Sequence, residues 1–448
     1  MNYTAIQELQ SSLKGQLLLP ENENYEQARQ LWNGAVKHKP AVIILPETVE
    51  DVQAAINFAT AQQLPFSVRG GGHDWAGRSL NEGGVVINLQ KLKNIYIDPA
   101  EKVAIVQGGI TGAELIAAAE PHGLVAVTGS IGVVGFTGLT LGGGYGPLSP
   151  SFGLAVDNVL SAEIVLADGS VITASETEHA DLFWAIRGGG GNFGVVVSMT
   201  VRLHTVRPLL TGLIMFPWSE AETVFKAYAR IMPTAPDELA LFAGMMHTPD
   251  GNPAMFLNPV WYGDEAKGEE QMSALKQLGN PFMVQVAPMK YSDLLGMFDA
   301  HVVNGLHYTA QTRSLAELDD DAIAAIIKSV AEVTSPLSLI NIHHFHGAPS
   351  RVPLNSTAFG LRKSHFMMEF ISAYAPEDVA NDAAHRQWAH NLSASVSKQA
   401  IPGGYPNILG PDEHEQIAQS YGTNLTKLQQ IKHQYDPTNL FKGISIPR

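Results

Sequence analysis

The sequence predicts an α+β fold with two domains, and a C-terminal segment that returns to the first domain. The length of 448 residues, 45% of them hydrophobic, is enough for a large core and two domains. Short strand-like and helical segments separated by glycine clusters fill residues 1–207. Longer amphipathic segments with fewer glycines alternate with strand-like stretches over residues 208–401, and residues 402–448 form the returning segment.

Composition excludes several classes of protein. The net charge of −15 and the pI near 5.5 argue against a nucleic-acid or anionic-membrane partner, since both require clustered Lys and Arg. The chain has no cysteine, which excludes disulfides, iron–sulfur clusters and thiolate catalysis. Its N-terminus lacks the pattern of a signal peptide, and no apolar run is long enough to span a bilayer. We therefore expect a cytoplasmic protein.

The first domain begins with a strand–helix–strand unit. Ala41–Leu45 is a short apolar run typical of a buried strand, and Pro46 ends it. Thr48 is placed to N-cap a helix that runs through Ala61, with two acidic residues in its first turn. Phe66–Val68 then predicts a second strand that leads directly into three glycines.

Further along this domain the pattern predicts one helix near Thr111–Ala119 and a β-hairpin. The hairpin is indicated by two alternating apolar runs on either side of Asp168-Gly169. The string ADLFWAIRGGGGNFGVVVSMTVRLHTV predicts a helix, a glycine loop and a long strand.

The second domain is predicted from alternating helical and strand-like segments. Glu220–Ile231 and Asp264–Leu278 have the spacing of amphipathic helices, and Ala254–Tyr262 and Ser338–His346 resemble strands. The C-terminal string EHEQIAQSYGTNLTKLQQIKHQYDP predicts a helix pair closed by a proline turn.

Four glycine clusters stand out: Gly70–Gly72, the stretch Gly129–Gly146, Gly188–Gly191 and Gly403-Gly404. Glycine lets backbone N–H groups converge on an anion and approach a flat ring closely, although a single cluster is more often a simple turn. None has the strand–GxGxxG–helix spacing of a Rossmann fold, and there is no Walker A lysine. Phosphates would therefore be held by several loops rather than by one helix N-terminus.

Four strings carry a family resemblance: VRGGGHDWAG, GGGYGPLSPSFGLAVDNVLSAEIVLADGSV, DLFWAIRGGGGNFGVV and YDPTNLF. In order and spacing they resemble the FAD-linked oxidases of the vanillyl-alcohol-oxidase superfamily, in particular the berberine-bridge-enzyme-like group with its bacterial 6-hydroxynicotine oxidases. The resemblance implies a PCMH-type FAD-binding domain of two subdomains, followed by an α+β substrate domain with an antiparallel sheet. It is loose in the middle of the chain.

The resemblance implies FAD bound covalently through the flavin 8α carbon to His73. A loop histidine without covalent chemistry is the alternative for this position. Asp157, Asn158 and Asn192 either contact the cofactor or only position loops. The residues expected to bind the cofactor are Arg69, Gly70, Gly71, Gly72, His73, Asp74, Gly77, Gly129, Ser130, Val134, Gly135, Gly138, Gly142, Gly143, Gly144, Gly146, Asn192, Val195, Val196 and Asn407.

Departures from the family pattern refine this expectation. Ile131 occupies the position where many members carry a second, cysteinyl link, so attachment is single at most. Val134 stands where the family has a small residue beside the reactive edge of the flavin, which favours an oxidase that uses dioxygen. The C-terminus lacks the usual Asn-rich string, so any contact from it must come from the backbone or from Ser445.

Removal of hydride from a C–OH or C–N bond also needs a base. By the resemblance this is Tyr405, whereas a carboxylate base is not expected, because its family position falls near Leu354. In a strand His344 and His346 share one face, where we expect them to line the substrate pocket, and His343 takes the other. A metal site or ordinary packing are the alternatives for these histidines. Arg362 and Tyr308 are weaker pocket candidates.

The sequence thus predicts a flavin-dependent oxidase. Its partners would be dioxygen and a small hydroxylated or amine-bearing organic substrate, with no metal, nucleic acid or membrane. A flavin dehydrogenase with another electron acceptor and a non-catalytic flavin-binding protein are the alternatives.

Overall fold

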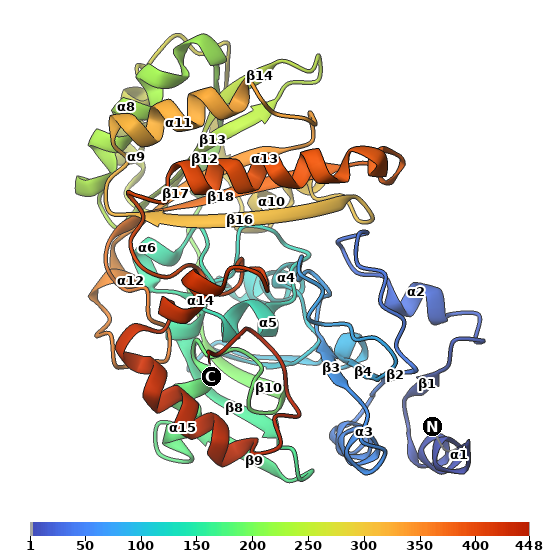
Figure 1. The fold of residues 1–448 in the computed structure, drawn as a ribbon. Helices are drawn as coiled ribbons and strands as arrows, with labels where there is room; N and C mark the ends of the chain where they lie inside the picture. The colour runs from blue at the N-terminus through green and yellow to red at the C-terminus, as the bar shows by residue number, and fades with distance from the viewer. Residues whose placement is uncertain (1–2, 448) are drawn as a thin grey trace.

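The computed structural model describes residues 3–447. Met1 and Asn2 of the predicted first domain, and Arg448 of the predicted returning segment, lie outside the described residues. The molecule has a lower part built on two small sheets and an upper part built on one large sheet (Figure 1). Among the described residues, no helix has the length and apolar character needed to cross a membrane.

The first sheet of the lower part has the strand order β1-β2-β4-β3. β2, β4 and β3 run parallel, and β1 is antiparallel to β2. Its elements are α1 (Tyr3–Ser12), β1 (Gln16–Leu18), α2 (Tyr25–Arg29), β2 (Val42–Leu45), α3 (Val49–Ala61), β3 (Phe66–Arg69) and β4 (Val85–Asn88). The predicted cap of α3 is confirmed: Thr48 accepts the backbone N–H of Asp51, whose carboxylate accepts that of Thr48.

The second sheet of the lower part is antiparallel, with the order β5-β6-β10-β8-β9. Its strands are β5 (Ile95–Asp98), β6 (Val103–Gln107), β8 (Val159–Val165), β9 (Val171–Ser175) and β10 (Val195–Arg202); β7 (Leu124–Val125) and β11 (His204–Thr205) pair separately. The helices here are α4 (Gly112–Ala119), α5 (Phe136–Leu141), α6 (Ser149–Phe152) and α7 (Ala180–Ile186). The predicted hairpin is confirmed, and Gly169 supplies its positive φ of 80°.

The upper part contains a seven-stranded sheet with the order β15-β12-β14-β13-β17-β18-β16, in which every pairing is antiparallel. Its strands are β12 (Leu209–Pro217), β13 (Leu239–His247), β14 (Pro253–Trp261), β15 (Met283–Met289), β16 (His307–Leu315), β17 (Leu339–Phe345) and β18 (His365–Tyr374). Its helices are α8 (Ala221–Ile231), α9 (Glu265–Lys276), α10 (Tyr291–Gly296), α11 (Asp320–Val330), α12 (Ala348–Arg351) and α13 (Asp382–Ser395). The α+β class and the antiparallel sheet are thus confirmed.

The two faces of the large sheet have different neighbours. Alternate residues such as Ile340, Ile342, Met368 and Phe370 are buried in a core shared with α8, α11 and α13. These helices cover the upper face, and the opposite face looks down onto the lower part (Figure 1). Because side chains alternate along each strand, the intervening residues point toward the glycine loops.

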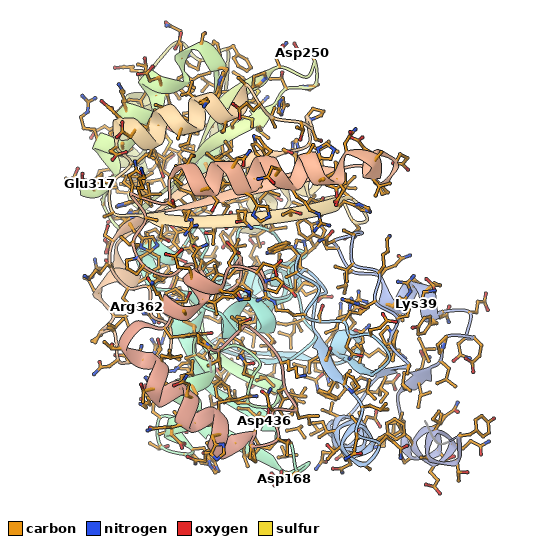
Figure 2. All side chains as sticks on the ribbon, viewed as in Figure 1. Lys39, Asp168, Asp250, Glu317, Arg362 and Asp436 are labelled. Atoms are coloured by element: carbon orange, nitrogen blue, oxygen red, sulfur yellow. The ribbon has the colours of Figure 1, made fainter. Side chains whose placement is uncertain are left out.

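The C-terminal segment lies against the lower part, where α14 (His414–Gln419) and α15 (Leu425–Tyr435) are drawn in red (Figure 1). α15 packs against α7. The turn after α15 is held by Asp436, whose carboxylate accepts the backbone N–H groups of Leu440 and Phe441 and is labelled in Figure 2. Lys432 donates to the carbonyls of Asn192 and Phe441, which ties this turn to a glycine loop.

Candidate active site

A cavity of about 500 Å³ is lined by loops of the lower part and by the lower face of the seven-stranded sheet. The loops make its floor, to which the glycine clusters around Gly71, Gly135 and Gly190 contribute. The strands β13, β14, β16, β17 and β18 make its roof. Each of these two walls carries chemically reactive side chains.

The floor depends on glycine because two loops meet there. β3 ends at Arg69, and the next residues curve under the cavity. A Cβ atom on Gly71 would lie 2.4 Å from the backbone nitrogen of Gly135, a distance that no side chain tolerates. Gly72 adopts a φ of 75°, which L-residues rarely adopt. Glycine is therefore needed here for a close backbone approach and for a left-handed turn.

Other glycines leave open space above the floor. A Cβ atom on Gly138 or Gly191 would meet no atom within 4 Å, and both residues line the cavity. A floor without side chains lets a flat ring system and a diphosphate approach the backbone closely, so the residues present fit FAD. The predicted cofactor residues that line the cavity are Gly70, Gly71, Gly72, His73, Asp74, Gly129, Ser130, Val134, Gly135, Gly138, Val196 and Asn407.

His73 follows the floor glycines and also lines the cavity. Its Nε2 atom is buried and has no hydrogen-bond partner. Burial lowers the pKa of His73 to about 4. The imidazole is therefore neutral near pH 7 and retains a nitrogen lone pair that can act as a nucleophile or as an acceptor.

Tyr405 lies in the cavity wall with an unusual set of partners. Its phenol oxygen accepts the backbone N–H groups of Gly144 at 3.0 Å and Tyr145 at 3.3 Å, and the side-chain N–H of Asn407 at 3.0 Å. Positive φ angles of 126° at Gly143 and 77° at Gly144 shape the turn that presents both amides. Burial raises the pKa of Tyr405, and the three N–H donors act in the opposite direction because they stabilise the phenolate.

The roof carries a short row of polar groups on an otherwise largely apolar surface. Asn341 of β17 stands opposite Glu369 of β18 and donates to its carboxylate at 2.9 Å. Burial raises the pKa of Glu369, so this group is held closer to its neutral form than an exposed carboxylate. His343 lies two residues from Asn341; both of its ring nitrogens are buried without partners, and burial lowers its pKa to about 3. Its ring centroid is 4.3 Å from that of Tyr145.

Comparison with known proteins decides the family. The FAD binding domain family matches residues 40–175, and the family of berberine and berberine-like proteins matches residues 404–443. An FAD-linked oxidoreductase of Dictyostelium discoideum is 30% identical over 98% of this chain and 95% of its own length. The (R)-6-hydroxynicotine oxidase of Paenarthrobacter nicotinovorans is 30% identical over 96% of each chain.

The chain is a berberine-bridge-enzyme-like FAD-linked oxidoreductase. Its fold is similar to the crystal structure of 6-hydroxy-D-nicotine oxidase from Arthrobacter nicotinovorans, with a TM-score of 0.87 and 27% identity over 97% of this chain and 98% of that one. FAD is therefore its cofactor, and the family resemblance of the four sequence strings is confirmed.

In this oxidoreductase the roof histidine is not the one expected. His344 and His346 do share a face, with ring centroids 5.1 Å apart, but they point away from the cavity, and His344 packs against Phe366 of the helix-covered core. His343 lines the cavity instead. Neither face of β17 is exposed to solvent, so alternation alone did not reveal which one faces the substrate side. Within residues 3–447, no group of three His, Asp or Glu side chains is arranged to hold a metal ion.

Several predicted cofactor residues support the loops from behind instead of lining the cavity. The Arg69 guanidinium lies under Gly72 and donates to the carbonyl of Ala28. Gly77 packs against Val36, where a Cβ atom would lie within 3 Å of its methyl groups. Val195 is part of the core of the first sheet, because its side chain points into that sheet's packing layer.

Most of the Gly142–Gly146 turn lies behind the cavity lining. Gly142, Gly143, Gly144 and Gly146 do not line the cavity, and only Tyr145 of this turn does. A Cβ atom on Gly142 would lie 2.0 Å from Asn407, and one on Gly146 would lie 1.9 Å from a backbone oxygen. These glycines allow the turn to pack tightly and to direct two amides at Tyr405.

The C-terminal segment completes one wall. Lys442, Gly443 and Ile444 line the cavity, whereas Ser445 does not. Asn192 holds this segment: its side chain donates to the carbonyl of Ile444 at 2.6 Å and accepts the N–H of Gly443 at 2.9 Å. Asn192 thus holds this loop and does not itself line the cavity.

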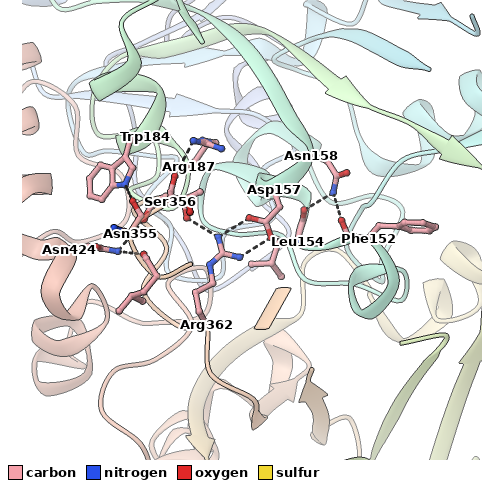
Figure 3. A network of polar contacts seen from close by, with 12 residues as sticks. Phe152, Leu154, Asp157, Asn158, Trp184, Arg187, Asn355, Ser356, Arg362 and Asn424 are labelled. Carbon is pink, nitrogen blue, oxygen red and sulfur yellow. Dashed lines mark hydrogen bonds and ion pairs between the residues drawn. The ribbon is translucent and has the colours of Figure 1, made fainter. Parts of the chain in front are cut away.

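Arg362 serves as an anchor between the two parts of the molecule. Its guanidinium binds both oxygens of Asp157 at 2.8 Å and the hydroxyl of Thr357, in a buried network that Figure 3 shows. The loop that carries Asp157 donates two backbone N–H groups to the carbonyls of Gly143 and Gly144. Arg362 therefore supports the Gly142–Gly146 turn from outside the cavity. Tyr308, the other weaker pocket candidate, does line the cavity.

Sequence reasoning missed Glu369 and Asn341. Leu354, the position considered for a carboxylate, is 42% exposed on the surface. The string HFMMEFISAY has the continuous apolar and aromatic content of a buried strand, and a single carboxylate inside such a strand is a signal for a functional site.

Proposed function

We propose that this oxidoreductase is an FAD-dependent oxidase that takes hydride from a small organic substrate bearing a hydroxyl or amine group and returns the electrons to dioxygen as H2O2. The observation that carries the proposal is the placement of His73, Tyr405 and Glu369 around one cavity. Bound FAD supplies an acceptor for the hydride at its N5 atom.

His73 would hold the cofactor covalently, in accordance with its position after the floor glycines. A neutral imidazole is needed for the bond, and the lowered pKa keeps it neutral. We predict that the yellow colour stays with the acid-precipitated wild-type protein and is released from a His73→Ala variant. Free release from the wild type would refute the covalent link.

Tyr405 is proposed as the base that receives the substrate O–H or N–H proton. Three N–H donors converge on its oxygen and would stabilise the phenolate that such a base forms, against the burial that raises the pKa of this phenol overall. Glu369 faces the same space from the roof, paired with Asn341, and would orient the hydroxyl or amine of the substrate. The apolar roof side chains Phe242 and Phe256 would exclude water from it.

The test is a substrate screen read as flavin bleaching without oxygen, followed by admission of air. An oxidase should recover its yellow colour within the mixing experiment and produce one H2O2 per substrate consumed. Bleaching followed by slow recovery in air, with fast recovery on adding a quinone, would instead identify a dehydrogenase. A protein that binds flavin but is bleached by none of the alcohols and amines would be a non-catalytic flavin-binding protein.

A further inference from the structure

Trp32 joins the His73 loop to the upper part of the molecule. Its ring stacks on the His73 imidazole, with centroids 4.2 Å apart and planes 14° from parallel. It also stacks on the ring of Tyr308 in β16, with centroids 3.8 Å apart and an angle of 21°. All three rings line the cavity, although they come from segments far apart in the sequence.

The backbone around Trp32 is fixed on both sides. Its N–H donates to the carbonyl of Gly72, directly before His73, at 3.0 Å. Its carbonyl accepts the N–H of Gly305 at 3.0 Å, two residues before β16. The side chain of Asn33 accepts the N–H of Tyr308 at 3.0 Å and donates to the same residue's carbonyl at 2.9 Å. Residues 32–33 therefore hold the indole in a defined place between the two parts.

The His73 ring needs such support. Its buried Nε2 atom makes no hydrogen bond, so that atom does not set the ring orientation. A flat aromatic neighbour at stacking distance restricts rotation about χ2, because tilting the imidazole would bring it into contact with the indole face.

We propose that Trp32 is a positioning residue for attachment of the flavin at His73. By holding the plane of the imidazole, it aims one ring nitrogen at the flavin 8α carbon. The inference rests on the proposed covalent link. Attachment forms one N–C bond and breaks the imidazole N–H and one 8α C–H bond. The two hydrogens pass to the flavin ring, which becomes two-electron reduced, and dioxygen accepts both electrons and both protons to form H2O2.

The test separates total flavin from covalent flavin in Trp32→Leu and Trp32→Phe. Each protein is purified from riboflavin-starved cells so that it carries little attached flavin. It is then incubated with excess FAD in air, and the acid-precipitable flavin is followed over time beside total bound flavin. Misplacing a reacting group by about 1 Å costs on the order of a hundredfold in rate. We expect Trp32→Leu to bind FAD but to attach it at least about tenfold more slowly, and Trp32→Phe, which can still stack, to recover most of the rate.

Two further variants serve as controls for the loss of stacking and for the loss of a tryptophan elsewhere. Tyr308→Leu removes the second stacking partner and leaves Trp32 in place, so it should slow attachment less than Trp32→Leu does. Trp218→Leu removes a partly buried tryptophan that packs on Phe225 in the upper core, and it should attach flavin at the wild-type rate.

The inference is overturned if Trp32→Leu attaches flavin as fast as the wild type, or if Trp32→Phe is as slow as Trp32→Leu. If Trp32→Leu does not fold, Tyr308→Leu is compared with the wild type instead. An unchanged rate of flavin attachment in Tyr308→Leu would then reject the role of the stacked rings. If the wild-type protein carries no acid-stable flavin, the covalent link itself is rejected and the inference with it. This outcome differs from one in which the wild type attaches flavin and Trp32→Leu attaches it at the same rate, which rejects only the role of Trp32.

Discussion

Replacing Tyr405 with phenylalanine removes the one oxygen atom on which three N–H donors converge. The ring stays, so its packing against Phe359 and the glycine turn changes little. If the phenol is the base, flavin reduction should slow by roughly a hundred- to ten-thousand-fold, the usual contribution of such a group. That range corresponds to about 2.7–5.5 kcal/mol of activation free energy.

The same change has a cost in stability that the structure allows us to work out. The side chain of Asn407 keeps a second acceptor, the carbonyl of Leu139 at 2.9 Å. The amides of Gly144 and Tyr145 lose their acceptor, and a buried donor without a partner costs about 1–3 kcal/mol. The free energy of unfolding should therefore fall by about 2–6 kcal/mol for the two amides together, and by less if a water molecule enters the space and accepts their N–H groups.

The assay is anaerobic stopped-flow reduction at saturating substrate and several pH values, with denaturant unfolding in parallel. Tyr291→Phe is the matched control, because this buried phenol bonds to Thr128 and does not line the cavity. It should lose about 1 kcal/mol of stability and keep its reduction rate. A loss under about fivefold in Tyr405→Phe would remove the phenol from the mechanism. Glu369, not His344 or His346, would then be the residue to test.

Three other outcomes are expected. Val134→Leu should slow reoxidation by air with little effect on substrate reduction, as measured by mixing the reduced enzyme with oxygenated buffer; equal slowing of both steps would reject a specific role. Arg362→Leu should cost about 3–5 kcal/mol in denaturant unfolding, because it leaves the buried Asp157 carboxylate unpaired. The exposed pair of Arg351 is the control and should change by less than about 1 kcal/mol in Arg351→Leu. Finally, stability should fall as the pH drops from about 7 toward 4. Burial lowers the pKa of His343 and His344 to about 3 and that of His365 to about 4. In this range the unfolded chain therefore binds protons that the folded chain does not, and each of these groups contributes up to about 1.4 kcal/mol per pH unit. A flat unfolding free energy over this range would contradict their neutral, buried state.

Local signals in the sequence were sufficient for the elements whose ends are set by neighbouring residues. Thr48 and Asp51 lie three residues apart and fix the start of α3 by themselves. Asp168-Gly169 specifies its hairpin turn in the same way. The floor glycines and His73 were found because they form one continuous string.

Local signals could not predict which residues form the roof of the cavity, because the roof depends on pairing between strands that are distant in the sequence. Asn341 meets Glu369 only through the register of β17 with β18. A shift of one residue would exchange the cavity face for the helix-covered face, and both are largely buried. The sequence therefore favoured the His344 and His346 pair for the cavity side, whereas His343 is the histidine of this strand that lines the cavity.

The alternation along β17 and β18 separates the demands of folding from those of recognition. Ile340, Ile342, Met368 and Phe370 fill the core under the helices, while their immediate neighbours in the chain face the cavity. A substitution at a cavity-facing position can change which molecule fits without opening a hole in that core. The glycine floor belongs to other segments, so it is untouched by such a change. A lineage of such enzymes can thus explore new substrates by single replacements on one side of a sheet, while its redox chemistry is inherited intact.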